Sequence, residues 1–259
     1  MGSGGAGESA VTGRPARGDF SGKKILVTGA RQGIGFACAQ AFAEAGAQVA
    51  LADISPEVVG AAERIRNLTG AETTEHQVDL ADPATAPRLV REVVEKCGGI
   101  DVLVYAAGVL VPEPFLELSV DAWDRTFAVN ARAAILVAQA TARHLVDRGA
   151  EGRIILFASI VARSVARLNN TSYAASKAAL VQAARCMALE LAPRGITVNA
   201  ISPGSTSTDM LLDVQMGGDP AAVESVIRGD AASWRLGIPL GRLADPSDQA
   251  AMALSLIHI

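Results

Sequence analysis

The chain has 259 residues and a formal net charge of −4; half of its residues are hydrophobic and 19% are charged. This composition excludes a disordered chain, and it leaves no basic field that would hold nucleic acid or an anionic membrane. The three cysteines lie far apart in apolar stretches, which predicts reduced thiols and no metal site. The sequence has neither a secretory leader nor an apolar run of about 18 residues, so a cytoplasmic protein without a membrane span is expected.

Residues 1–19 are rich in Gly, Ser, Ala and Arg and predict a disordered tail, and a single domain is expected over residues 20–253. In that domain, short apolar runs alternate with helical stretches. The predicted strands are Lys24–Thr28, Gln48–Asp53, Glu72–Asp79, Ile100–Tyr105, Arg153–Ser159 and Thr197–Ile201. The predicted helices are Ile34–Ala45, Pro56–Leu68, Pro83–Cys97, Trp123–Arg148 and Tyr173–Ala192.

The predicted strands are almost continuously apolar, which is typical of strands buried on both faces. Their alternation with helices predicts an α/β fold: a doubly wound parallel sheet of the Rossmann type, covered by helices on both sides. The stretch from Pro203 to Pro246 interrupts the alternation and is expected to form a lid or a binding loop.

A glycine-rich turn, Thr28–Gly35, links the first predicted strand to the first helix. Its glycines let the backbone approach a pyrophosphate at the helix N-terminus, although a plain strand-to-helix turn is the alternative. Asp53 ends the second strand, where a carboxylate binds ribose hydroxyls and repels a 2′-phosphate. Asp53 therefore favours NAD over NADP, while Arg31 could face a phosphate and is a weaker signal for NADP. The turn residues expected at the cofactor are Gly29, Arg31, Gln32, Gly33, Ile34 and Gly35.

Four polar residues are candidates for catalysis. Tyr173 and Lys177 are four residues apart and share one helix face, where the ammonium would lower the pKa of the phenol and suit it to proton transfer. Ser159 ends the fifth predicted strand, at the edge where ligands bind. Asn130 lies inside a helix and would either hold a water molecule beside Lys177 or satisfy a local carbonyl. Each residue alone also has a plain structural explanation, as a surface pair, a turn or a helix contact.

Together these motifs resemble the short-chain dehydrogenase/reductase family over residues 20–253. The resemblance rests on the glycine-rich turn, Asp79, the run Ala106–Gly108, Asn130, Ser159, the Tyr173–Lys177 pair and the run Asn199–Gly204. It implies that Tyr173 is the general acid/base and that Lys177 binds the nicotinamide ribose. It also implies that Ser159 orients the substrate oxygen and that Asn130 holds a proton-relay water molecule.

The resemblance further implies an NAD cofactor and a homotetramer. Asp79 would bind the adenine amine and Thr208 the nicotinamide carboxamide. Further cofactor contacts are expected at Leu80, Ala106, Ala107, Gly108, Pro203, Gly204 and Thr206.

The chain departs from the family in two places. Tyr105 replaces the usual Asn, which puts the packing near the adenosine end in question, and Tyr173 follows Ser159 by 14 residues, one more than is common.

Two segments, residues 203–210 and 234–242, resemble the 2,3-dihydro-2,3-dihydroxybenzoate dehydrogenases of siderophore biosynthesis. That resemblance implies NAD-dependent oxidation of the ring 3-hydroxyl to give 2,3-dihydroxybenzoate. Arg167 is a candidate partner for the substrate carboxylate, with a solvated surface arginine as the alternative. The other functions considered are a 3-oxoacyl-carrier-protein reductase, a polyol or sugar dehydrogenase, a nucleotide sensor without catalysis, and an inactive truncated fragment.

The final six residues, Leu254–Ile259, stand where family members continue into a last strand. One back-translation of these residues, CTGTCTCTTATACACATC, matches a transposase end used in sequencing libraries. We therefore expect residues 254–259 to be non-native and the sheet to lack its final strand. An unfinished sheet would expose an edge and lower the stability of the protein.

Overall fold

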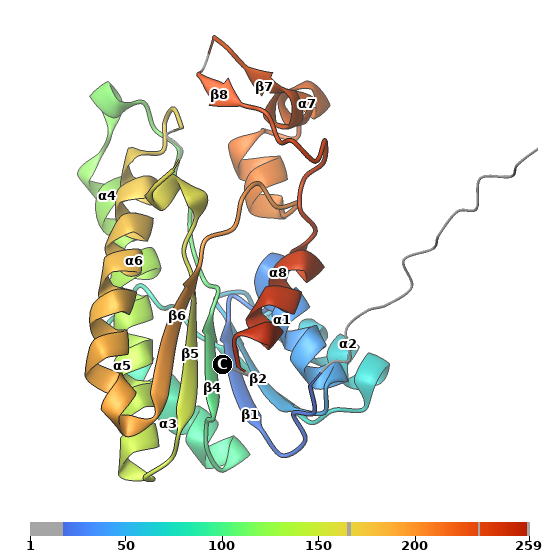
Figure 1. Ribbon diagram of the computed structural model, residues 1–259, viewed down its shortest axis with the longest axis vertical. Coiled ribbons are helices and arrows are strands. Elements are labelled where there is room, and N and C mark those ends of the chain that lie inside the picture. Colours follow the sequence, from blue (N-terminus) through green and yellow to red (C-terminus); the bar gives the residue numbers. More distant parts are fainter. Residues whose placement is uncertain (1–17, 165–166, 233, 258–259) are drawn as a thin grey trace, which may run out of the picture.

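The computed structural model describes residues 18–164, 167–232 and 234–257 (Figure 1). Six parallel strands form one sheet in the order β3-β2-β1-β4-β5-β6, which confirms the predicted doubly wound fold. The strands are β1 (Lys24–Thr28), β2 (Gln48–Asp53), β3 (Thr73–Gln77), β4 (Val102–Tyr105), β5 (Gly152–Phe157) and β6 (Ile196–Ile201). All six predicted strands are present, with ends shifted by at most two residues.

Helices cover both faces of the sheet (Figure 1). One face carries α1 (Gly33–Glu44), α2 (Val58–Thr69) and α8 (Pro246–Ser255). The other face carries α3 (Thr85–Cys97), α4 (Val120–Phe127), α5 (Ala134–Asp147) and α6 (Thr171–Leu191). Short 3₁₀ turns lie at Phe115–Glu117, Ile160–Ala162 and Ala192–Arg194. No helix within the described residues is both long and apolar enough to cross a membrane.

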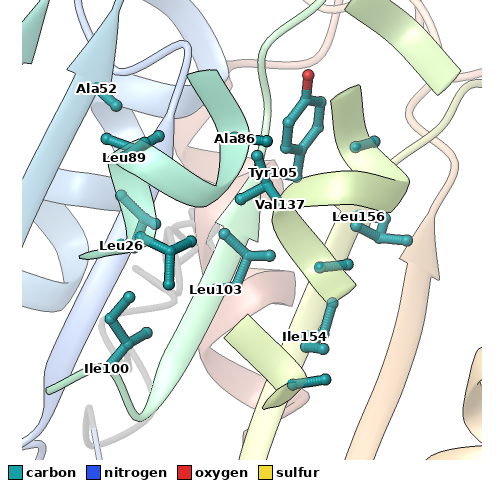
Figure 2. Close-up of a cluster of buried hydrophobic side chains, with 14 of the residues drawn as sticks. Leu26, Ala52, Ala86, Leu89, Ile100, Leu103, Tyr105, Val137, Ile154 and Leu156 are labelled. Atoms are coloured by element: carbon teal, nitrogen blue, oxygen red, sulfur yellow. The ribbon is translucent and has the colours of Figure 1, made fainter. Parts of the chain in front are cut away.

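Two apolar clusters pack on opposite faces of the sheet because successive strand side chains point to opposite sides. Leu26 and Leu103 face the helices α3 and α5 (Figure 2), while Ile25 and Val104 face α1 and α2. This two-sided burial accounts for the continuous apolar runs of the sequence. Leu254, Leu256 and Ile257, within the segment expected to be non-native, pack against the α1 cluster. Residues 1–17 and 258–259, which belong to the predicted tail and the predicted non-native end, lie outside the described residues.

The predicted helix Trp123–Arg148 is divided in the structure. Between α4 and α5 the chain forms a π-helical segment, Ala128–Ala133, which contains Asn130. The packing expected for Tyr105 near the adenosine end is also corrected. Its side chain is fully buried in the core on the α3 and α5 side (Figure 2), and its hydroxyl donates to the carbonyl oxygen of Val129 at 2.7 Å.

The segment 203–246 lies beyond the carboxyl ends of the strands (Figure 1), and we call it the loop region. It contains a π-helical segment (Met210–Gln215), α7 (Pro220–Arg228) and the short strands β7 (Gly229–Asp230) and β8 (Arg235–Leu236). A small apolar cluster of Leu211, Met216 and Val226 holds it together.

Candidate active site

A cavity of about 330 Å³ lies at the carboxyl edge of β1, β4 and β5, beneath the loop region. In the sheet order, β1 is the neighbour of both β2 and β4, so the chain changes direction at this point. Ligands of open α/β sheets bind in the crevice at such a switch point. The cavity therefore lies where ligands of this class of fold bind.

The glycine-rich turn forms one wall of this cavity. Gly29 has a φ of 65°, and a Cβ there would lie 2.7 Å from the backbone of Ala107, so only glycine fits. Helix α1 begins at Gly33 without a side-chain cap, which leaves its first N–H groups free for an anion. Gln32 adds a buried side-chain oxygen without a partner among the described residues. These residues fit the pyrophosphate of a dinucleotide.

Asp53 and Arg31, the two residues that bear on the choice of nicotinamide cofactor, lie side by side. The carboxylate of Asp53 accepts the Arg31 N–H at 3.1 Å and the Ser55 N–H at 3.0 Å. The Arg31 guanidinium instead binds the carboxylate of Glu57 at 2.8 Å. The Arg31 guanidinium is thus paired with Glu57, while the Asp53 side chain at the end of β2 has no cationic side-chain partner among the described residues.

Tyr173, Ser159 and Lys177 meet on the opposite wall. Tyr173 lies in the first turn of α6, and its phenol is hydrogen-bonded to the Ser159 side chain at the end of β5. Lys177 follows one turn later, with its Nζ 5.7 Å from the centre of the Tyr173 ring. The same ammonium donates to the carbonyl oxygen of Phe157 at 2.8 Å. The structure thus brings the predicted catalytic hydroxyls and the lysine together at one end of the cavity.

The electrostatics of this group differ from the expectation that Lys177 lowers the pKa of the phenol. Burial raises the pKa of Tyr173, and the groups that lower it are the Ser159 hydrogen bond and the Arg167 charge. Burial also lowers the pKa of Lys177 to about 8. The lysine is buried without a carboxylate partner among the described residues, so its charged form is itself disfavoured.

Asn130 lies behind this group and is fully buried in the π-helical segment. Its Oδ1 accepts the Val109 N–H at 2.8 Å, and its Nδ2 donates to the Val109 carbonyl at 2.9 Å and to Ser176 Oγ at 3.1 Å. Of the two possibilities left open by the sequence, the side chain satisfies a backbone segment, and that segment is the loop after β4. Both amide protons are engaged, so a water molecule could bind this side chain only as a donor to Oδ1.

Arg167 lies between the cavity and a second one of about 250 Å³, which Arg235 also lines. Its guanidinium donates to Ser205 Oγ at 2.7 Å and to Gln215 Oε1 at 3.1 Å. Both partners are neutral, no carboxylate pairs with Arg167 in the described part of the chain, and its Nε is buried without a partner. A cation held in this way is available to an anionic group that enters the cavity.

The cavity collects most of the predicted site residues. Those that line it are Gly29, Arg31, Gln32, Gly33, Ile34, Gly35, Asp53, Ala106, Gly108, Ser159, Arg167, Tyr173, Lys177, Pro203, Gly204, Thr206 and Thr208. The predicted residues that do not line it are Asp79, Leu80, Ala107 and Asn130. Asp79 is exposed and accepts the Ala81 N–H, Leu80 packs in the core, and Ala107 and Asn130 support the cavity from behind.

Sequence reasoning missed several residues of the cavity. Ser205 and Gln215 hold Arg167, and Asn170, which precedes α6, carries a buried oxygen without a partner among the described residues. Ser205 lies inside the segment 203–210 that was singled out, so its polar type was a usable signal. Gln215 had no such signal, since only the fold of the loop region brings it to Arg167.

The family sequence pattern described as short chain dehydrogenase matches residues 23–217, which include the glycine-rich turn and the Tyr173–Lys177 pair. The chain belongs to the short-chain dehydrogenase family. It is therefore an oxidoreductase that acts on alcohols, and its nicotinamide cofactor is expected in the cavity described above.

Two curated proteins are similar to this chain over most of its length. A 2,3-dihydro-2,3-dihydroxybenzoate dehydrogenase of Bacillus subtilis is 36% identical over 92% of this chain and 90% of the relative. The oxidoreductase UcpA of Escherichia coli strain K12 is 37% identical over 92% of this chain and 89% of the relative.

Two solved structures agree with the fold of this short-chain dehydrogenase. A short-chain type dehydrogenase/reductase from Mycobacterium marinum has a TM-score of 0.82 at 33% identity, covering 92% of this chain and 89% of that one. A short chain dehydrogenase from Burkholderia cenocepacia J2315 in complex with NADP has a TM-score of 0.77 at 33% identity, covering 92% and 91%.

Proposed function

We propose that the protein oxidises a secondary alcohol on a ring that carries a carboxylate, with NAD as the hydride acceptor. The most specific substrate that we propose is 2,3-dihydro-2,3-dihydroxybenzoate, which would give 2,3-dihydroxybenzoate in siderophore biosynthesis. The observation that carries the proposal is Arg167, a cation with only neutral partners among the described residues, beside Tyr173. The activity named for the Bacillus subtilis relative, an oxidation of a cyclic diol carboxylate, fits such a cavity.

The choice of NAD rests on the charges around Asp53. A 2′-phosphate at the adenosine ribose would meet this carboxylate, while the nearest cation, Arg31, is engaged by Glu57. The solved short chain dehydrogenase from Burkholderia cenocepacia is in complex with NADP, so the fold alone does not select NAD and the preference must come from local residues. The charge arrangement at the end of β2 supports NAD in this chain.

The proposed chemistry divides among three residues. Bound NAD would supply the acceptor for the hydride that leaves the carbinol carbon. Tyr173 acts as the general base and takes the hydroxyl proton, so the C–H electron pair leaves as a hydride while a C=O bond forms. Ser159 donates a hydrogen bond to the substrate oxygen, and Lys177 places a positive charge beside the phenol and binds the nicotinamide ribose. The ketone then tautomerises to the aromatic diol.

Assembly and location complete the proposal. We propose a homotetramer in the cytoplasm, with a small-molecule substrate and no nucleic-acid or membrane partner. We place the site in a single domain of residues 20–253 and propose that residues 254–259 are non-native. Mass photometry of the purified chain tests the tetramer, and the codons of the source DNA test the origin of the last six residues.

The decisive experiment measures NADH formation by the purified full chain with 2,3-dihydro-2,3-dihydroxybenzoate. Parallel reactions replace NAD with NADP, and replace the diol with a polyol, a sugar, or a 3-hydroxyacyl thioester. We expect the diol carboxylate with NAD to give the highest kcat/KM and 2,3-dihydroxybenzoate as the product. A higher kcat/KM for a neutral polyol or for the thioester with NADP would overturn this assignment.

A further inference from the structure

The hydroxyl of Tyr105 makes a contact that the proposed chemistry does not use. Tyr105 ends β4 and is completely buried, and its hydroxyl donates to the carbonyl oxygen of Val129 at 2.7 Å. Burial raises the pKa of this phenol well above its ordinary value, so the group keeps its proton and acts as a donor. Val129 lies in the π-helical segment directly before Asn130. The contact therefore joins the end of a central strand to the segment that carries Asn130.

A second contact joins the same two segments. Val109 lies four residues after Tyr105, and its N–H and carbonyl both bind the Asn130 side chain, at 2.8 and 2.9 Å. Tyr105 and Val109, four residues apart, thus bind the neighbouring residues Val129 and Asn130 of the π-helical segment. The chain between these points includes Ala106 and Gly108, which line the cavity. A displacement of the π-helical segment would therefore also displace the cavity lining formed by the loop after β4.

Gly108 shows how close this arrangement lies to the catalytic lysine. A Cβ at Gly108 would lie 3.4 Å from Asn130 Oδ1 and 3.5 Å from Lys177 Nζ. The amide and the ammonium therefore flank the same glycine. Single turns of π-helix within α-helices are rare and are frequently found at functional sites. Here the turn places Asn130 between the loop after β4 and Ser176 on α6.

We propose that Tyr105 is a positioning residue of the active site, whose hydroxyl holds the π-helical segment in the register at which Asn130 binds Val109 beside Lys177. Tyr105 does not line the cavity and acts through Asn130. This role goes beyond the proposed function, because the oxidation of any alcohol by Tyr173 and Lys177 would depend on the same loop after β4.

Amide hydrogen exchange tests the proposal without any substrate. Tyr105→Phe keeps the buried ring and removes only the hydroxyl. We expect about tenfold faster exchange at the Val109 amide and across residues 128–133, measured by NMR, which is the scale of one lost buried hydrogen bond. Asn130→Ala removes the acceptor itself and is expected to accelerate exchange at Val109 at least as much.

A matched control is Thr141→Val in α5. Thr141 is fully buried, and its hydroxyl has no partner among the described residues, so the variant also removes one buried hydroxyl. We expect no change at Val109 in this variant. Unchanged exchange at Val109 in Tyr105→Phe, or equal acceleration in Thr141→Val, would overturn the proposal.

Kinetics then test whether Tyr105 acts through Asn130. With NAD and the alcohol that the enzyme oxidises fastest, Tyr105→Phe should lower kcat about tenfold and leave the KM for NAD within about twofold. In an Asn130→Ala background the same change should lower kcat less than about twofold, because the residue it acts through is gone. An equal fall in kcat in both backgrounds would show that Tyr105 does not act through Asn130. The exchange result stands whether or not the proposed substrate is correct, so the two proposals can fail separately.

Discussion

Besides the glycine-rich turn, two further walls of the active-site cavity are built differently from each other. The wall formed by β4, β5 and α6 holds Ser159, Tyr173 and Lys177 above two apolar cores, and its polar groups bind one another or the backbone. Among the described residues, the wall formed by Arg167 and the loop region rests on a small apolar cluster with three buried members. Trp234 and Leu236 in this region are 92% and 86% exposed.

This difference separates catalysis from substrate choice. Proton transfer requires donor and acceptor atoms at fixed positions, and buried strands and helices provide them. Substrate choice depends on which side chains the loops present, and loops on a rigid scaffold vary at little cost to stability. The following predictions test this division, beginning with the largest expected effect.

The catalytic wall should tolerate almost no change in Tyr173, the group that takes the proton from the alcohol. Tyr173→Phe removes the only phenol in the cavity and should lower kcat by about 10³-fold, because a positioned acid/base contributes about 10²–10⁴-fold. Its melting temperature should stay close to that of the wild type, since the ring is retained. Steady-state kinetics and circular dichroism check both outcomes. A residual kcat within tenfold of the wild type would contradict the assigned role.

The cores under the catalytic wall should determine the stability of the whole fold. Leu103 on β4 is completely buried in the cluster on the α3 and α5 face, and Leu103→Ala should lower the free energy of unfolding by about 3 kcal/mol. The comparison is Trp234→Ser, which truncates an exposed side chain of the loop region. This change should alter the free energy of unfolding by less than about 0.5 kcal/mol. Urea unfolding curves measure both, and similar losses in the two variants would refute the contrast.

Arg167→Ala should change substrate binding more than catalysis. Loss of a charge-assisted contact should raise the KM for the carboxylate substrate about tenfold, a larger effect than the fall in kcat that follows from removing the Arg167 charge near Tyr173. Arg163 offers a control four residues away, because it is an exposed arginine of the same loop. Arg163→Ala should leave KM unchanged. An unchanged KM in Arg167→Ala would show that another group binds the carboxylate.

Lys177 gives the catalytic wall a pH signature. Its pKa is lowered by burial from 10.5 to about 8, so between these values the unfolded chain binds more protons than the folded one. The contribution of Lys177 to stability should therefore become more favourable as pH rises across this window, and the difference between the wild type and a variant without the lysine isolates it. Urea unfolding of the wild type and of Lys177→Met at pH 8 and pH 10.5 measures the effect. A constant difference between the two proteins would show that the lysine is not buried as described.

The sequence predicts the catalytic wall well because its signals are local. The strands have continuous apolar runs, and the glycine-rich turn and the Tyr173–Lys177 pair have fixed spacings. The π-helical segment was not predicted, because one extra residue in a turn barely disturbs the apolar pattern from Trp123 to Arg148. Tyr105 stood out as unusual, but only the fold shows that its hydroxyl reaches Val129.

The wall formed by Arg167 and the loop region was harder to predict, for a physical reason. Gln215 meets Arg167 across 48 positions of chain, and nothing in either local sequence encodes that contact. The interpretation of Arg167 itself needed only its charge and its place near Tyr173. Charged residues can thus be proposed from sequence, while the neutral residues that hold them need the structure.

The most direct test of this division compares 2,3-dihydro-2,3-dihydroxybenzoate with its methyl ester, in the wild type and in Arg167→Ala, with NAD. The ester keeps the reacting alcohol and removes only the negative charge. We predict that the wild type has an about tenfold higher KM for the ester at a similar kcat, and that Arg167→Ala no longer distinguishes the two. Equal KM values in the wild type, or a preference for the acid that survives in Arg167→Ala, would contradict the account.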